Sequence, residues 1–340
     1  MKLKIKKHSD AYYLTAFTLL FLFCFSVSFM LGRYPVTFSE LVKILLSKIF
    51  PIPVTWASQA ETVVIGVRLP RVLAASLIGA ALSAAGICYQ GLFQNPMVSP
   101  DVLGASAGAG FGAAMGLFFS FSYLGVSLSS FAFGMTAVLI VQFISGRVRS
   151  QPVMGLILSG MMIGSLFSSA TSFIKLVADP TNVLPSITYW LMGSLASIRP
   201  RDLLFAFIPI FAGIVPLILL RWRLNVLTLG EEEARSMGIN TKLLRGTVIL
   251  CATLMTAACV SISGMIGWVG LVIPHFTRML VGCDYRISLP SSMLLGASFL
   301  LVVDNFSRLL TTSEIPLGIL TAYVGAPFFL YLILREGKKL

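Results

Sequence analysis

Long apolar segments recur along the whole chain and constrain its fold more than any other feature. A membrane-spanning helix needs about 20 mostly apolar residues, and segments near that length follow one another through the sequence. Only 11% of the residues are charged, against about 25% in typical soluble proteins. We therefore expect an all-α polytopic membrane protein with about ten transmembrane helices. The expected helices lie at about residues 11–31, 72–91, 101–119, 124–145, 153–177, 202–221, 243–262, 268–281, 288–305 and 316–335.

The basic residues between these segments predict the orientation of the chain. A net charge of +12 would suit nucleic acid, but these residues lie in short loops, where they orient transmembrane helices. We therefore predict no nucleic-acid partner. The first apolar run is too long for a signal peptide and lacks an Ala-x-Ala site, so we interpret it as a retained helix. An even number of spans with lysines at both ends predicts a multi-pass protein of the cell (cytoplasmic or inner) membrane with both termini in the cytoplasm.

Three arginines on the opposite, outer side need an explanation. Arg68 and Arg71 precede the second apolar segment, and Arg308 lies one helical turn after Asp304. Arginine beside an uncharged span is costly unless it has a role at the interface. A local ion pair between Asp304 and Arg308 is one interpretation. A rim of arginines that meets a partner is the other.

A polar interruption at residues 228–240 predicts a short helix on the cytoplasmic side. Thr228 and Glu231 have the spacing of a capping box, Glu231 and Arg235 form a favourable i,i+4 pair, and Gly238 has the position of a C-terminal glycine. The helix is either a solvated loop element or a docking helix for a cytoplasmic partner. Its candidate contact residues are Thr228, Gly230, Glu231, Glu232, Glu233, Ala234, Arg235 and Gly238.

Several helix interruptions suggest where a pathway or gate could lie. Residues 36–50 are expected to form an amphipathic surface helix, and residues 186–197 a short or re-entrant piece that protein must cover at membrane depth. Residues 264–278 read as a broken helix that lines an interface or cavity. Helix starts are expected at the Ser99–Pro100–Asp101 cap and after a Thr311–Glu314 capping box. The pathway or gate candidates are Gln90, Asn95, Pro96, Gly104, Ser106, Gly108, Pro274 and His275.

Other kinds of site are not indicated. The small residues at 104–112 could resemble a phosphate loop, but no Lys-Ser/Thr follows them, so close helix packing is the favoured interpretation. The five cysteines show no CxxC spacing, and a single histidine–arginine pair is weak support for a metal. We therefore expect no metal site and no cofactor. Because no nucleotide-binding loop is present, the chain is expected not to be an enzyme, and ATP-driven transport would need a separate ATPase. Carboxylates at membrane depth are nearly absent, which argues against an ion-coupled carrier.

Several motifs, in order along the chain, resemble one known family. They lie at 68–71, 79–82, 90–100, 103–109, 229–238, 267–278, 284–286, 314–318 and 325–328. Together they resemble the FecCD-type permease subunits of ATP-binding-cassette (ABC) importers for ferric siderophores, haem and vitamin B12. One small departure is Tyr285, where members often carry histidine.

The resemblance implies a fold like that of the vitamin B12 importer permease, a type II ABC importer, with residues 1–340 as a single permease domain. It implies that residues 228–238 form a coupling helix on one of two ATPase copies. It also implies a second permease subunit, either an identical or a related chain, and an extracytoplasmic binding protein whose acidic residues meet Arg68, Arg71 and Arg308. The implied function is alternating-access import of an iron complex. Ferric siderophore is the expected cargo and haem or cobalamin the alternative, while an ion-coupled secondary transporter and a structural membrane protein are more distant possibilities.

Overall fold

The structure is a computed structural model that describes residues 8–147 and 152–336, and within these residues it is built from helices without strands. The helices up to the middle of the chain are α1 (His8–Met30), α2 (Phe38–Ser47), α3 (Ser58–Glu61), the π-helical η1 (Thr62–Arg68), α4 (Leu69–Leu92), the 3₁₀ turn η2 (Pro100–Leu103), α5 (Ala105–Phe118), α6 (Tyr123–Ser145) and α7 (Pro152–Val177). They are followed by α8 (Val183–Leu191), α9 (Pro200–Leu227), α10 (Glu231–Ser236), α11 (Thr241–Ser263), α12 (Val269–Val281), α13 (Tyr285–Leu309) and α14 (Leu317–Glu336).

The helices confirm the expected polytopic membrane fold. Within the described residues, seven helices are long and apolar enough to cross a membrane, and three shorter apolar helices accompany them at Ala105–Phe118, Val269–Val281 and Leu317–Tyr331. The short surface helix expected at 36–50 is α2, which begins with a capping box between Thr37 and Glu40. The short piece expected at 186–197 is α8 together with the loop after it.

The second spanning helix begins earlier than the sequence predicted. The expected helix start was near residue 72, and Pro70 lies inside the observed helix, where a proline normally clashes with the carbonyl four residues before it. Instead, helical structure is continuous from Ser58 to Leu92. The π-helical segment η1 precedes Pro70, and the Leu69 amide donates to the Val64 carbonyl five residues back. This wider turn accommodates the proline without ending the helix.

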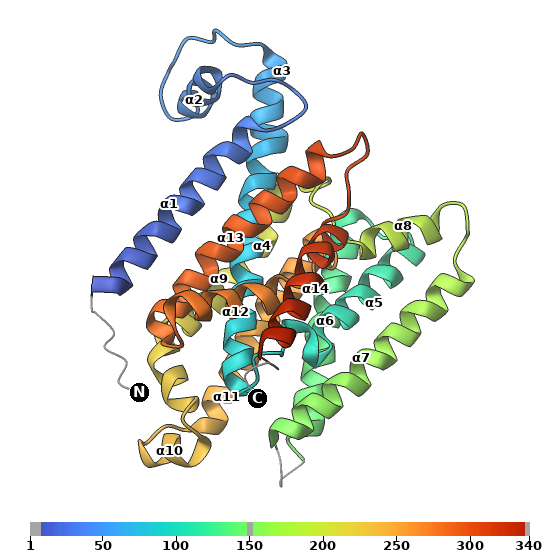
Figure 1. Cartoon of the computed structure of the whole chain (residues 1–340). Helices are drawn as coiled ribbons and strands as arrows, with labels where there is room; N and C mark the ends of the chain where they lie inside the picture. Colours follow the sequence, from blue (N-terminus) through green and yellow to red (C-terminus); the bar gives the residue numbers. More distant parts are fainter. Residues whose placement is uncertain (1–7, 148–151, 337–340) are drawn as a thin grey trace.

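Helix α4 lies at the centre of the bundle, beside α13, α11 and α12 (Figure 1). Glycines permit the close approach: a Cβ atom added at Gly86 would lie 1.8 Å from the Gly270 carbonyl oxygen of α12. The small residues of α5 have the same role, because a Cβ at Gly108 would lie 2.6 Å from the Phe133 carbonyl oxygen of α6. The helix-packing interpretation of residues 104–112 is therefore confirmed.

The predicted cap at Ser99 is confirmed in position, whereas the one at Thr311 is wrong. Ser99 is the N-cap residue of η2, with Pro100 and Asp101 in its first turn, but it makes no side-chain cap hydrogen bond, and Gly104, whose φ is +78°, separates η2 from α5. Thr311 donates its hydroxyl to the Ser313 carbonyl rather than capping α14, which begins only at Leu317. Glu314 instead accepts a hydrogen bond from Arg71. In this case a distant charged partner outweighs the local capping pattern.

The two ends of the bundle carry different short helices. Helix α2 lies at one end, and α10 lies at the opposite end (Figure 1). The first turn of α1 and the last turn of α14 point toward the end that carries α10 (Figure 1). The outer arginines and the predicted coupling segment are thus separated by the length of the bundle.

Candidate functional site

The outer arginines form a buried cluster rather than an exposed row. Arg68 and Arg71 are each 3% exposed and Arg308 is 7% exposed. Arg68 donates to the Phe29 carbonyl at 2.6 Å and also to the Tyr34 carbonyl. Because both acceptors are backbone atoms, no carboxylate compensates the charge of Arg68 through an ion pair in the described part of the chain.

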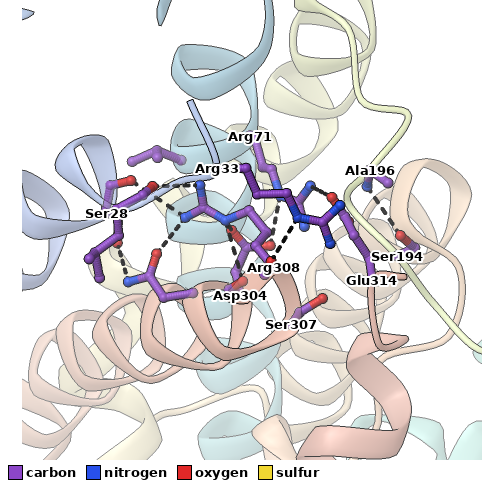
Figure 2. Close-up of polar contacts among 12 residues, drawn as sticks. Ser28, Arg33, Arg71, Ser194, Ala196, Asp304, Ser307, Arg308 and Glu314 are labelled. Atoms are coloured by element: carbon purple, nitrogen blue, oxygen red, sulfur yellow. Dashed lines mark hydrogen bonds and ion pairs between the residues drawn. The ribbon is translucent and has the colours of Figure 1, made fainter. Parts of the chain in front are cut away.

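Asp304 lies at the centre of this cluster and is completely buried. Its Oδ1 accepts from Arg71 Nε at 2.8 Å, and its Oδ2 lies 3.1 Å from Arg308 Nε, which confirms the predicted local pair. Arg71 also donates from Nη1 to Glu314 Oε1 at 2.8 Å. Figure 2 shows Arg71 between the two acids, with Arg33 and Arg308 beside them. The cluster thereby joins α4, α13 and the segment that precedes α14.

Further contacts extend the cluster to the end of α1. Arg308 donates to the Leu31 carbonyl at 3.1 Å and to the Asn305 side chain, which itself donates to Ser28 at 2.9 Å. Exposed Arg33 donates to the Thr311 carbonyl at 2.8 Å. Within the cluster three buried arginines face two acids, so one positive charge remains uncompensated.

A cavity of about 210 Å³ opens beside the cluster. Its lining is Gly32, Arg33, Tyr34, Val63, Val67, Arg68, Arg71, Arg308 and Glu314. An anionic group that enters this cavity would meet more positive than negative charge. The sequence identified the three arginines but not their burial or this cavity, because both depend on residues far apart in the chain.

Helix α10 forms where the sequence predicted a coupling helix, but its cap differs. Gly230, with φ +134°, occupies the N-cap position. Thr228 instead ends α9, and its hydroxyl donates to the Asn225 carbonyl at 2.7 Å, so the predicted capping box is wrong. The predicted pair between Glu231 and Arg235 is present at 3.3 Å. Gly238 adopts φ +77° after the helix, which confirms its role at the C-terminal end.

The charged side chains of α10 divide into an outer and an inner set. Glu232, Glu233 and Arg235 are exposed, whereas Ala234 is completely buried. Glu231 turns toward the bundle and pairs with Arg245 of α11. Arg245 was predicted only as one of the basic residues that orient the helices. Its partner is 14 positions away, outside the range of helical pair rules.

The eight pathway candidates do not come together in one site. Gln90 is buried and donates to the Leu271 carbonyl at 3.2 Å while it accepts from Arg278. The Asn95 side chain accepts from the Met97 amide at 2.9 Å in an exposed turn that includes Pro96. Ser106 donates to Asp101.

The other four pathway candidates lie within helix packing or on one helix. Gly104 and Gly108 pack against α7 and α6, Pro274 is buried in α12, and His275 is half-buried on the same helix. Two further cavities are each more than twice the volume of the one beside the arginine cluster, and the residues that line them include none of the eight candidates.

These two larger cavities adjoin one backbone junction. The first, about 580 Å³, is lined by Tyr123, Pro185, Ser186, Tyr189, Trp190, Ser194, Ala196, Ser197, Ile262, Ser263 and Gly264. The second, about 680 Å³, is lined by Leu191, Met192, Met265, Gly267, Trp268, Gly318, Ile319, Ala322, Tyr323, Ala326 and Pro327. None of these lining residues is charged.

Three chain segments meet at that junction. The Ser194 amide donates to the Ser263 carbonyl at 2.7 Å, and the Leu317 amide donates to the Gly193 carbonyl at 2.8 Å. A Cβ atom at Gly264 would lie 2.2 Å from the Trp190 carbonyl oxygen. The break after α11 therefore does line cavities, as the sequence predicted for residues 264–278.

Comparison with known proteins gives consistent matches over most of the chain. The sequence model described as the FecCD transport family matches residues 19–335. The molybdate import system permease protein MolB of Haemophilus influenzae is 40% identical over 325 residues, which cover 95% of this chain and 96% of that protein. A Helicobacter pylori protein described as an iron chelatin transport system permease is 40% identical over 278 residues, or 82% of this chain and 84% of that protein.

A solved structure supports the same relationship. It is described as a metal-chelate type ABC transporter in an inward-facing conformation. The two chains superimpose with a TM-score of 0.85 and 39% sequence identity, over 95% of this chain and 98% of the other.

Proposed function

The chain belongs to the FecCD transport family and is a permease of an ABC importer, and from this premise we propose that its cargo is an iron complex, a ferric siderophore. Membership of a family of ABC permeases favours ATP-driven import over the ion-coupled carrier considered from sequence. Because the chain carries no nucleotide-binding loop, ATP hydrolysis falls to a partner ATPase.

The lining of the two larger cavities is the main support for an organic metal chelate as cargo. Trp190 lies beside serine hydroxyls in the first cavity, Trp268 lies beside glycine and methionine residues in the second, and neither lining contains a charged side chain. Such a surface suits a large ligand with apolar and hydrogen-bonding groups. A bare dianion would lose its hydration there without gaining a compensating cation.

A molybdate oxyanion is the second candidate cargo. It is favoured by the 40% identity with the Haemophilus influenzae molybdate permease over almost the full length of both chains. Haem and cobalamin are further alternatives within the same mechanism. They are bulky and partly apolar, as the cavity lining requires.

The proposed assembly follows from the two different ends of the bundle. We place α10 on an ATPase at the cytoplasmic end, where its exposed Glu232, Glu233 and Arg235 would meet the partner. Both termini would lie on this side. A second permease subunit, identical or related, would complete a central pathway above two ATPase copies, with residues 1–340 as one permease domain and 228–238 as its coupling segment.

At the outer end, the proposed partner is a binding protein that delivers the cargo. Of the three predicted docking residues, Arg68 supports this role best, because its charge is met only by backbone carbonyls and it lines the 210 Å³ cavity. An acidic side chain of the binding protein would supply the missing negative charge. Arg71 and Arg308 already contact Asp304, so their contribution to docking would be mainly to shape the cavity.

Docking can be tested on the permease in lipid nanodiscs. We expect Arg68→Met to weaken binding of the binding protein by about tenfold, the effect of losing roughly 1.4 kcal/mol of interaction. Thermal stability measured in parallel separates docking from folding. Unchanged affinity in a stable variant would exclude Arg68 from docking.

Cargo can be tested by uptake of labelled ferric siderophores, haem, cobalamin and molybdate in cells with and without the gene. Loss of ferric siderophore uptake alone is the expected result. Loss of uptake of another cargo alone would support an importer of that cargo and contradict ferric siderophore as the cargo. Uptake that is abolished by a protonophore while cellular ATP stays high would contradict ATP-driven import.

A further inference from the structure

The attachment of α10 to the bundle determines how a partner could act through it. The helix has only six residues, and Ala234 is its buried residue. Both of its connections contain a glycine with positive φ, Gly230 at +134° and Gly238 at +77°. A Cβ atom at Gly238 would meet no atom within 4 Å, although the next residue, Ile239, packs against the core. By themselves, these connections allow α10 to change its angle to the membrane helices.

Two contacts with α11 oppose this freedom, a hydrogen bond from Arg235 Nε to the Thr241 hydroxyl at 3.3 Å and an ion pair. Glu231, at the first position of α10, pairs with Arg245 of α11. The Arg245 side chain is only 13% exposed, whereas that of Arg235, which also pairs with Glu231, is 66% exposed. An ion pair with a buried partner is weakened less by solvent and salt than an exposed one. The contact with Arg245 is therefore the firmer of the two.

The surroundings of this pair are formed by the ends of spanning helices, and the Glu231 side chain stays 32% exposed. Glu231 and Arg245 line a cavity of about 280 Å³ together with Leu92, Phe93, Gln94, Val153, Leu227 and Gly230. These residues come from the end of α4, the start of α7 and the end of α9. The ion pair thus anchors α10 where three spanning helices end.

Helix α11 connects this anchor to the cargo cavities. From Arg245 to Ser263 the helix is continuous, a length of about 27 Å at 1.5 Å per residue. It packs against α9, α4 and α6. At its far end Ser263 and Gly264 line the first cavity and contact the 190–194 segment. A movement of α10 that displaces Arg245 can therefore be transmitted through α11 to the cavity wall.

We propose that the Glu231–Arg245 ion pair is the joint that fixes α10 to α11 and transmits its movement to the cavities, with Arg245 as a positioning residue for transport. This inference rests on the proposed role of α10 as the coupling helix. With the ion pair in place, α10 and α11 would move together. Without it, α10 would be held less firmly to the bundle. Arg245 itself need not touch cargo or nucleotide.

The joint can be tested first on the permease alone, without partner or cargo. We expect Arg245→Met to accelerate amide hydrogen exchange in a peptide covering residues 231–240 by about fivefold or more, since one of the two attachments of α10 is lost. Lys242→Met is the matched control, because it removes an exposed cation from the same helix end. Unchanged amide hydrogen exchange of residues 231–240 in Arg245→Met would overturn the proposal that this ion pair fixes α10.

Transmission is then tested in the intact assembly with its ATPase in proteoliposomes. We expect Arg245→Met to keep the ATPase bound and hydrolysing while cargo transported per ATP falls at least about fivefold, the lower end of typical coupling between sites. The exchanged pair Glu231→Arg with Arg245→Glu should recover part of this ratio. An unchanged ratio, or loss of the ATPase from the variant, would overturn the inference. Failure of the unaltered assembly to transport any cargo would instead contradict the proposed function. The amide hydrogen exchange of residues 231–240 would still show whether the Glu231–Arg245 pair fixes α10.

Discussion

Replacing Asp304 with asparagine is expected to destabilise the permease more than any change at the exposed end of the cluster. Asp304 is completely buried and contacts both Arg71 and Arg308. Asparagine keeps the shape and one acceptor, but it removes the negative charge and places an amide where Arg308 Nε now meets a carboxylate oxygen at 3.1 Å. The uncompensated charge of the cluster rises from one to two.

The magnitude follows from the burial of both partners. Removing one member of a buried ion pair typically costs about 3–5 kcal/mol, because the remaining charge loses water without gaining a partner. Glu314→Gln is the control. The Glu314 side chain is 25% exposed and Arg71 keeps Asp304, so about 1 kcal/mol or less is expected.

Thermal inactivation in lipid nanodiscs provides the assay, since large membrane proteins often unfold irreversibly and their stability is then a rate. If the whole loss of about 3–5 kcal/mol appears in the unfolding barrier, Asp304→Asn should unfold roughly 100- to 4,000-fold faster at a fixed temperature, because each 1.4 kcal/mol is a factor of about ten. A rate within about threefold of the unaltered protein, or an effect no larger than that of Glu314→Gln, would refute the account of the cluster given above.

Three further changes test other parts of the structure. Gly86→Ala adds a methyl group 1.8 Å from the Gly270 carbonyl oxygen and should lower the stability of the permease by about 2 kcal/mol or more. Gly66→Ala is the control, because a Cβ atom there would meet nothing within 4 Å, and it should be nearly neutral. Equal thermal stabilities of the two variants would contradict the packing of α4. The capping amide and hydroxyl of α2 lower the pKa of Glu40, so the capped state is fully favoured above the unfolded pKa of about 4.3 and is lost as the pH falls through the lower folded pKa. Amide exchange of α2, corrected for its intrinsic pH dependence, should rise in that range, and should show no such step in Glu40→Gln. Gly230→Ala places a side chain at φ +134°, a strain of about 1–3 kcal/mol, and should lower transport per ATP; an unchanged ratio would show that the start of α10 tolerates reorientation.

The predicted coupling segment shows how far local sequence rules extend. Gly238 and the Glu231–Arg235 pair were predictable, because each depends on residues within one or two turns. The Thr228 capping box failed although its spacing was correct, because α9 continues to Leu227 and Thr228 becomes its end. A capping pattern specifies a helix start only where the preceding helix has already stopped.

The outer arginines show the complementary limit. Their position beside a span indicated that they had a role, and the pair of Asp304 with Arg308 followed from helical spacing. Their burial did not follow from the sequence. Arg71 is 233 residues from Asp304 and 243 residues from Glu314, and only the packing of α4 against α13 brings these groups together.

The sequence by itself therefore determined the class of the protein, the positions of nearly all membrane helices and the location of α10. Those properties depend on apolar length and on neighbours along one helix, which are local quantities. The tertiary structure alone decided that the arginines are buried, that Arg245 holds Glu231, and that uncharged cavities adjoin the break after α11. These features depend on which helices pack together and at what distance, and the free energy of such contacts belongs to pairs of distant residues rather than to any segment of the sequence.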